Sequence, residues 1–194
     1  QGTHEDKTIV QFEYEMFGNI VVAFISAIVP LLVAIANADY LCHLYQENLV
    51  YSPIVGQLYV WTSGFSLFAF LITLAREMVK DIEDKEGDQE MECRTIPIVW
   101  GDKITKIIVS IILIITAALI TYIAFYILPF PHEWSTLSTR YVIFGIITPI
   151  ICSLILLWAA KTPQEIHRTQ VVIKFTMFIG VMYSFVIQQN LLML

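Results

Sequence analysis

“IVGQLYVWTSGFSLFAFLITLA”, residues 54–75, contains no charged side chain, and it is followed at once by “REMVKDIEDKEGD”, residues 76–88. The second stretch holds six acidic side chains in thirteen positions. About 20 apolar residues are enough for a helix to cross the ~30 Å hydrocarbon core of a bilayer. The sequence therefore predicts a membrane-spanning helix with acid concentrated at its end.

The composition of the whole chain is that of a membrane protein. Of the 194 residues, 57% are hydrophobic and 14% are charged, with a mean hydropathy of +0.71, whereas about a quarter of the residues of soluble domains are charged. We predict an all-α fold, a polytopic transmembrane helix bundle of five spans in a single domain. The predicted spans are residues 19–38, 54–75, 107–130, 141–160 and 171–189.

Lysine and arginine residues alternate between the two sides of this bundle. Residues 76–106 contain six of them, residues 161–174 contain three, and residues 131–140 contain one. Because cytoplasmic loops retain Lys and Arg, we predict that residues 76–106 form a cytoplasmic cap loop. The N-terminus is then inside and the C-terminus outside.

Charge and cysteine usage exclude several function classes. The net charge of −6 leaves no basic surface of the kind that nucleic acids require, so no nucleic-acid partner is expected. Cys42, Cys93 and Cys152 show no CxxC spacing and are predicted to be free thiols. The four histidines are scattered without the spacing of zinc ligands.

The acids of residues 76–88 follow a helical pattern. On a helix that turns ~100° per residue, four carboxylates share roughly a 60° arc, while two others point elsewhere and are expected to matter little. The four are Glu77, Asp81, Asp84 and Asp88, and the two are Glu83 and Glu86. A solvated loop is one interpretation. Like charges at helical spacing repel each other. The second interpretation is therefore that a cation binds to this face and offsets the repulsion.

A polar and aromatic stripe continues the same arc into the preceding span. Its members are Tyr59, Ser63, Ser66, Phe70 and Thr73, at spacings of three and four residues. Small residues in such a stripe also allow close helix packing, so packing and substrate binding both remain open for it.

Carboxylates are hard oxygen ligands, and Mg²⁺ is typically held by one or two of them together with water and substrate phosphates. Asp84 and Asp88 are one helical turn apart, and Asp81 adds a third carboxylate. At a membrane boundary, this pattern favours a substrate with a diphosphate head and an apolar tail. We expect the tail to lie along the stripe, in contact with membrane lipid.

The stretch “REMVKDIEDKEGDQEMECRTIPIVWG”, residues 76–101, closely resembles the second aspartate-rich motif of the UbiA superfamily of intramembrane prenyltransferases. It looks most like the branch of geranylgeranylglyceryl phosphate geranylgeranyltransferases. The resemblance implies a nine-helix bundle in which Mg²⁺ joins two Asp-rich motifs to a prenyl diphosphate, from which the prenyl group passes to a lipophilic acceptor. By position, Asp81, Asp84 and Asp88 are the metal ligands and catalytic acids.

The same resemblance makes Arg76, Lys80 and Arg94 candidates for binding the diphosphate or the acceptor. Four stripe residues are the candidates for binding the tail, namely Tyr59, Ser66, Phe70 and Thr73. The acceptor is either a glyceryl phosphate ether lipid or an aromatic quinone precursor, and the motif does not choose between them.

The chain departs from the family in one motif. The first motif, N-x-x-x-D-x-x-x-D, is absent, because the asparagines before the acidic stretch have no Asp four residues on. The pairs are Asn19 with Ala23, Asn37 with Leu41, and Asn48 with Ser52. We therefore expect a C-terminal portion of a family member, with four N-terminal helices and the first motif preceding Gln1.

A different function class also fits an acidic loop on a membrane protein. A divalent-cation transporter or a non-enzymatic subunit would concentrate cations there. Transport normally requires an ionisable group near the middle of the bilayer, and only Asp39, near the end of the first span, comes close. The prenyltransferase is accordingly the preferred hypothesis.

Overall fold

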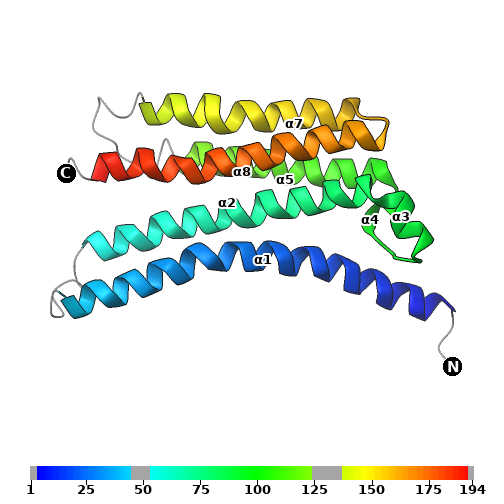
Figure 1. Ribbon diagram of the computed structural model, residues 1–194, viewed down its shortest axis with the longest axis horizontal. Helices are drawn as coiled ribbons and strands as arrows, with labels where there is room; N and C mark the ends of the chain where they lie inside the picture. Colours follow the sequence, from blue (N-terminus) through cyan, green and yellow to red (C-terminus); the bar gives the residue numbers. More distant parts are fainter. Residues whose placement is uncertain (1–3, 45–52, 124–136, 192–194) are drawn as a thin grey trace.

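The computed structural model describes residues 4–44, 53–123 and 137–191, and the regular structure in these ranges is helical (Figure 1). The elements are α1 (His4–Leu44), α2 (Pro53–Glu83), α3 (Lys85–Glu90), α4 (Ile96–Val99), α5 (Asp102–Tyr122), the π-helical η2 (Tyr141–Ile147), α7 (Thr148–Ala159) and α8 (Pro163–Leu191). The all-α prediction is confirmed.

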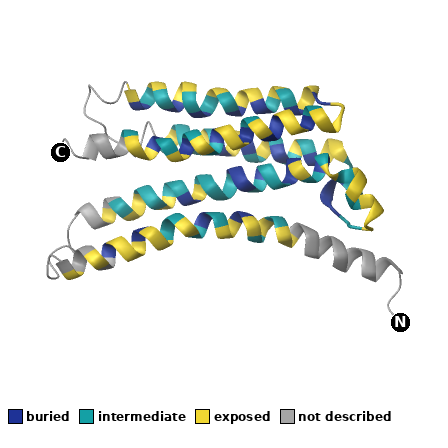
Figure 2. Ribbon diagram, viewed as in Figure 1, coloured by how far each residue is buried: buried dark blue, intermediate teal, exposed yellow. Residues whose placement is uncertain are grey.

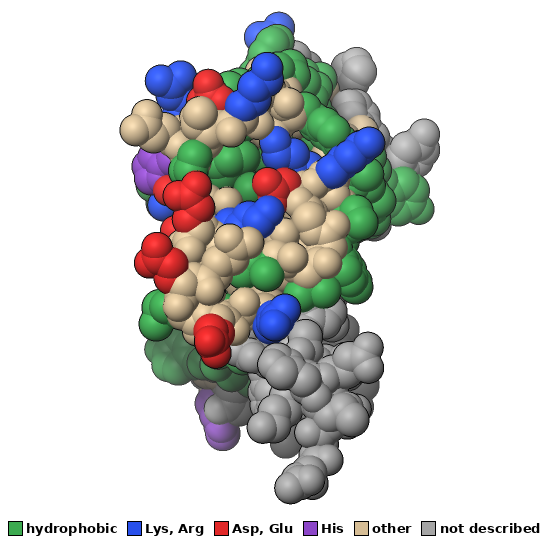
Figure 3. Space-filling model, turned by 90° about the vertical axis from the view of Figure 1, so that its right-hand side faces the viewer, with side chains coloured by type: hydrophobic (Ala, Val, Ile, Leu, Met, Phe, Trp, Pro, Cys, Tyr) green, Lys and Arg blue, Asp and Glu red, His purple; other side chains and the backbone are tan. Residues whose placement is uncertain are grey.

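The long helices lie side by side, and the short helices and one of the connecting turns lie at one end of the bundle (Figure 1). In Figure 1 this end, on the right, carries α3 and α4, the first residues of α1, and the turn between α7 and α8. Figure 3 looks onto it and shows Lys, Arg, Asp and Glu side chains gathered there, with hydrophobic side chains around the flanks. We call it the charged end.

Five helical segments are long and apolar enough to cross a membrane, as predicted. They are Phe17–Ala38, Leu58–Glu83, Asp102–Tyr122, Leu137–Ala159 and Pro163–Val186. Several helix boundaries differ from the sequence prediction. Helix α1 begins at His4 instead of residue 19, and α5 begins at Asp102 instead of residue 107. Residues 76–83, assigned to the cap loop, extend α2, and α8 begins at Pro163 instead of residue 171. The predicted end of the third span, residue 130, lies outside the described residues.

The start of α8 has a local cause. Thr162 and Glu165 form a capping box, in which Glu165 Oε2 accepts from the Lys161 N–H at 2.7 Å and the Thr162 N–H at 3.3 Å. Thr162 Oγ1 accepts from the Glu165 N–H at 3.4 Å. Pro163 stands at the first helical position, where its missing N–H costs nothing. These contacts start the helix eight residues before its apolar run.

The main core lies between α2, α5, α7 and α8. Buried aliphatic side chains from these helices form one cluster, which includes Ile72, Leu113, Ile150, Leu157 and Ile173. Large apolar side chains also cover outer faces of the bundle, for example Phe24, Ile114 and Phe175. Outward-facing apolar side chains are what a helix presents to lipid tails.

Helix α1 packs against α2 through small residues. Among the α1 side chains that the structure describes, the buried ones are Ala23, Ala27, Ala34 and Ala38. Their spacing of four and seven places them on one face. Exposed residues run along the outer side of α1 (Figure 2). Alanine at such positions lets two helix backbones approach closely within a membrane. We call this contact the alanine seam.

Two glycines provide a test of packing around α8. A Cβ at Gly180 would overlap the Phe68 ring, whereas a Cβ at Gly64 would meet no atom within 4 Å. We expect Gly180→Ala to lower the free energy of unfolding by about 1–3 kcal/mol, the usual cost of overpacking. Gly64→Ala should cost nothing, because alanine favours the helix by ~1 kcal/mol. Thermal unfolding in detergent measures both, and equal losses would contradict this packing.

Candidate functional site

The predicted acids occupy the charged end, on two successive helices. Asp81 lies in the last turn of α2 and Asp88 lies on α3. Asp84 stands between the two helices with φ −86° and ψ 0°, so the continuous helix of the sequence prediction bends there. The backbone bonds nevertheless keep helical spacing: the Asp84 N–H donates to Lys80 O at 2.9 Å, and the Asp88 N–H donates to Asp84 O at 3.0 Å. Asp84 and Asp88 therefore remain one turn apart.

The three aspartates differ in exposure. Asp84 is exposed, while Asp81 and Asp88 are half-buried. Within the described ranges, no group of three or more His, Cys, Asp or Glu side chains is arranged to hold a metal ion. Their oxygen donors nonetheless suit Mg²⁺, which commonly takes only one or two carboxylates from the protein. The described residues thus fit part of a magnesium site.

Asp81 also contacts the first helix. The Asn19 side-chain amide donates from Nδ2 to Asp81 Oδ2 at 2.7 Å, across 62 residues of sequence. Asn19 stands one helical turn before Ala23, on the alanine seam. The sequence does not predict this contact, because it relates Asn19 only to the absent N-x-x-x-D-x-x-x-D motif. The sequence feature that could have indicated this contact is a lone amide, Asn19, four residues before a row of alanines that begins at Ala23.

The basic side chains of the charged end fall into two groups. Arg76 is paired with Glu77, and Lys85 binds Asp102 at 2.6 Å. Lys80 is exposed and Arg94 is half-buried, and neither makes an ion pair or hydrogen bond with another described residue. Lys80 and Arg94 are therefore the predicted cations that are available to an anionic ligand.

The two acids that were expected to matter little have different surroundings. Glu86 is exposed. Glu83 is only 22% exposed, and its Oε1 lies 2.9 Å from His167 Nδ1 at the start of α8. Glu83 therefore links the end of α2 to α8, a contact that the helical pattern alone did not indicate.

The predicted stripe on α2 divides by depth. Tyr59 is 39% exposed and Phe70 is half-buried. Ser66 and Thr73 are buried, and their hydroxyls have no hydrogen-bond partner among the described residues. Several other hydroxyls in the long helices donate to the carbonyl four residues back, as Thr62 does to Leu58 O at 2.7 Å. Buried hydroxyls are normally paired, so Ser66 and Thr73 have unused capacity for polar contacts.

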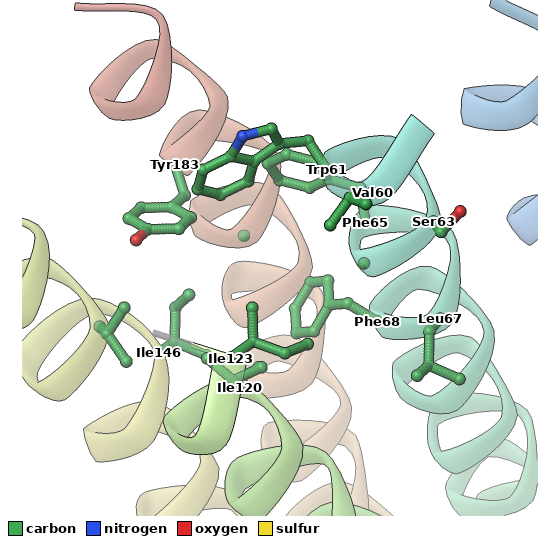
Figure 4. Close-up of a pocket in the computed structure, with 13 residues that line it drawn as sticks. Val60, Trp61, Ser63, Phe65, Leu67, Phe68, Ile120, Ile123, Ile146 and Tyr183 are labelled. Atoms are coloured by element: carbon green, nitrogen blue, oxygen red, sulfur yellow. The ribbon is translucent and has the colours of Figure 1, made fainter. Parts of the chain in front are cut away.

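An apolar pocket of about 240 Å³ lies in the half of the bundle away from the charged end. Helices α2, α5, η2 and α8 line it, and Figure 4 shows Trp61, Phe65, Phe68 and Tyr183 around it. Phe68 is 13 residues before Asp81 on α2, or about 20 Å at 1.5 Å per residue. None of the four stripe residues proposed for the tail lines this pocket.

Comparison with known proteins gives matches over most of the chain. The UbiA prenyltransferase family matches residues 12–182. The digeranylgeranylglyceryl phosphate synthase of Methanosphaera stadtmanae is 29% identical over 189 residues, covering 89% of this chain and 66% of that protein. The enzyme of the same name from Thermococcus onnurineus is 30% identical over 135 residues, covering 68% of this chain and 46% of that protein.

The chain therefore spans slightly less than two thirds of the first relative's length and less than half of the second's. A shorter match, to the digeranylgeranylglyceryl phosphate synthase of Pyrococcus furiosus, is 42% identical over 64 residues and covers 31% of this chain and 23% of that protein. No solved structure gives a significant match.

Proposed function

This chain belongs to the UbiA prenyltransferase family, and we propose that it forms the second-motif part of a Mg²⁺-dependent intramembrane prenyltransferase. The observation that carries the proposal is the position of Asp81, Asp84 and Asp88 at the charged end of a membrane-spanning helix. A prenyl diphosphate has the same polarity, with a charged head and an apolar tail. Its head fits the acids through a cation, and its tail fits the bilayer depth of α2.

The aspartates supply the hard oxygen donors that Mg²⁺ prefers. We propose that Asp81, Asp84 and Asp88 hold the metal together with the diphosphate. When bound, Mg²⁺ neutralises charge on the departing diphosphate, acting as Lewis acid and template for breaking the allylic C–O bond. The rest of its coordination would come from water, substrate and the first aspartate motif, which we place in helices before residue 1.

The chain's own side chains have complementary tasks. Lys80 and Arg94 would bind the diphosphate oxygens, since neither forms an ion pair with another described residue. Arg76 would join them by exchanging its contact with Glu77. The tail would lie along Tyr59, Ser66, Phe70 and Thr73. Apolar surroundings exclude water, so the allylic carbon would react with the acceptor and would not be hydrolysed.

For the acceptor, we propose a glyceryl phosphate ether lipid, because the relatives are named digeranylgeranylglyceryl phosphate synthases. An aromatic quinone precursor is the alternative. The two are distinguished by incubating the complete protein with radiolabelled prenyl diphosphate, Mg²⁺ and either acceptor. Label should enter the glyceryl phosphate product and be absent without Mg²⁺. Labelled aromatic product alone would reassign the acceptor, and no transfer to either would refute the proposed activity.

The orientation of the bundle is also a proposal, with the charged end in the cytoplasm. It is supported by the six-to-one ratio of basic residues in residues 76–106 and 131–140. The test uses single cysteines at Gln89 or Ser135, the latter outside the described residues, after Cys42, Cys93 and Cys152 are replaced by serine. In intact cells, an impermeant maleimide should label position 135 and spare position 89. Labelling of position 89 from outside would reverse the topology.

A further inference from the structure

We propose that Asn19 is a positioning residue for Asp81, so that α1 contributes to the metal-binding end of the site. This inference rests on the proposed function. Its basis is the 2.7 Å hydrogen bond from Asn19 Nδ2 to Asp81 Oδ2, which joins α1 to α2 at the charged end. A hydrogen bond to an ionised carboxylate is shorter and stronger than one between neutral groups. It fixes the side-chain rotamer of Asp81 and occupies one of its oxygens.

The other polar side chains described within the first span behave differently. Ser26 donates to Val22 O at 3.0 Å, and Asn37 donates to Val33 O at 2.7 Å, so both satisfy themselves on their own helix. The Asn19 amide instead donates its hydrogen bond to a residue of another helix. The contact does not stabilise α1 itself. It restrains the carboxylate of Asp81, which the proposed function assigns as a metal ligand. Groups that hydrogen-bond metal ligands commonly orient them in this way.

The alanine seam makes the contact precise. Ala23 and Ala27 follow Asn19 on the same face and bring α1 close to α2. Asn has a short side chain with two rotatable bonds, so its reach depends on this close approach. The hydrogen bond from Asn19 restricts the directions in which the Asp81 carboxylate can face. We infer that the seam and Asn19 together preorganise Asp81 for the cation.

The test is a double-mutant cycle in the complete protein, with Asn19→Leu, Asp81→Ala and both. Leucine has the same number and branching of side-chain heavy atoms as asparagine, and it removes the donor without opening a cavity. The probe is Mn²⁺, a spectroscopic substitute for Mg²⁺, titrated without substrate. We expect Asn19→Leu to weaken Mn²⁺ binding by roughly 10- to 100-fold, the usual effect of removing a group that orients a metal ligand. In the Asp81→Ala background it should have no further effect.

Asn37→Ala is the matched control, because Asn37 is also an amide on α1 but bonds its own helix; its Mn²⁺ affinity should equal that of the unchanged protein. Thermal unfolding is measured in parallel for every variant. Should Asn19→Leu not fold, Asn19→Ala replaces it in the cycle.

The outcomes separate the two proposals. If Asn19→Leu lowers thermal stability but leaves Mn²⁺ affinity unchanged, Asn19 only packs α1 on α2 and the inference fails. An equal weakening by Asn19→Leu with and without Asp81 would also overturn it, since the effect would not pass through Asp81. If Asp81→Ala itself leaves Mn²⁺ affinity unchanged, the metal site of the proposed function fails and the inference with it.

Discussion

Replacing either Asp84 or Asp88 by asparagine in the complete protein should reduce prenyl transfer by roughly a hundredfold or more. Asparagine keeps the size of aspartate and its place in the backbone, but it removes an anionic oxygen ligand. A hundredfold loss corresponds to about 3 kcal/mol of transition-state stabilisation, the scale on which single electrostatic contacts act in dehydrated sites. The measurement is Mg²⁺-dependent release of diphosphate at matched expression.

The control for these variants is Glu86→Gln. Glu86 lies on α3, between Asp84 and Asp88 in sequence, and it is exposed. An exposed charge contributes roughly 1 kcal/mol or less, so this variant should keep most of its activity. Glu83→Gln is not an equivalent control, because Glu83 is half-buried and contacts His167. Equal activities for all three variants would mean that these acids are only a solvated charge cluster.

The sequence predicted the bundle well because membrane spans have a simple physical signal. Lipid leaves the helix as the structure in which a single segment satisfies its own backbone, and that helix must present apolar side chains over about 20 residues. Hydropathy detects such an apolar run directly. The five predicted spans overlap the five helices of the structure. The start of α8 moved because local bonds, those of the capping box at Thr162, begin the helix before its apolar run.

The candidate site was less accessible to sequence reasoning. Helical periodicity gives the angular order of side chains on one helix, so it found the acids of α2 and α3. It carries no information about which side chain on another helix faces them. The contacts of Asn19 with Asp81 and of Glu83 with His167 join residues 62 and 84 positions apart, and they follow only from how the helices pack. The bend at Asp84 likewise interrupts a pattern that a continuous helix would have extended.

The second large effect concerns the 194 residues by themselves. Produced alone, they should release no diphosphate above a protein-free background, even with saturating Mg²⁺ and prenyl diphosphate. The described residues offer no group of three acidic, cysteine or histidine ligands for a metal, and the chain matches only 66% and 46% of its first relatives' lengths. In the two-motif arrangement proposed above, one aspartate motif would be half of the set that neutralises the diphosphate, and the proposed preceding helices would be needed to keep water out.

The control for this prediction is coexpression with the helices that we propose to precede residue 1. Helices of membrane proteins associate through packing after each has inserted, so coexpression of the helices that we place before residue 1 should restore Mg²⁺-dependent transfer. Restoration should fail when the 194-residue chain carries Asp88→Asn, because the reassembled site would again lack a ligand. Diphosphate release by the purified 194-residue chain alone would show that the second motif is sufficient, and the two-motif arrangement proposed for this protein would be wrong.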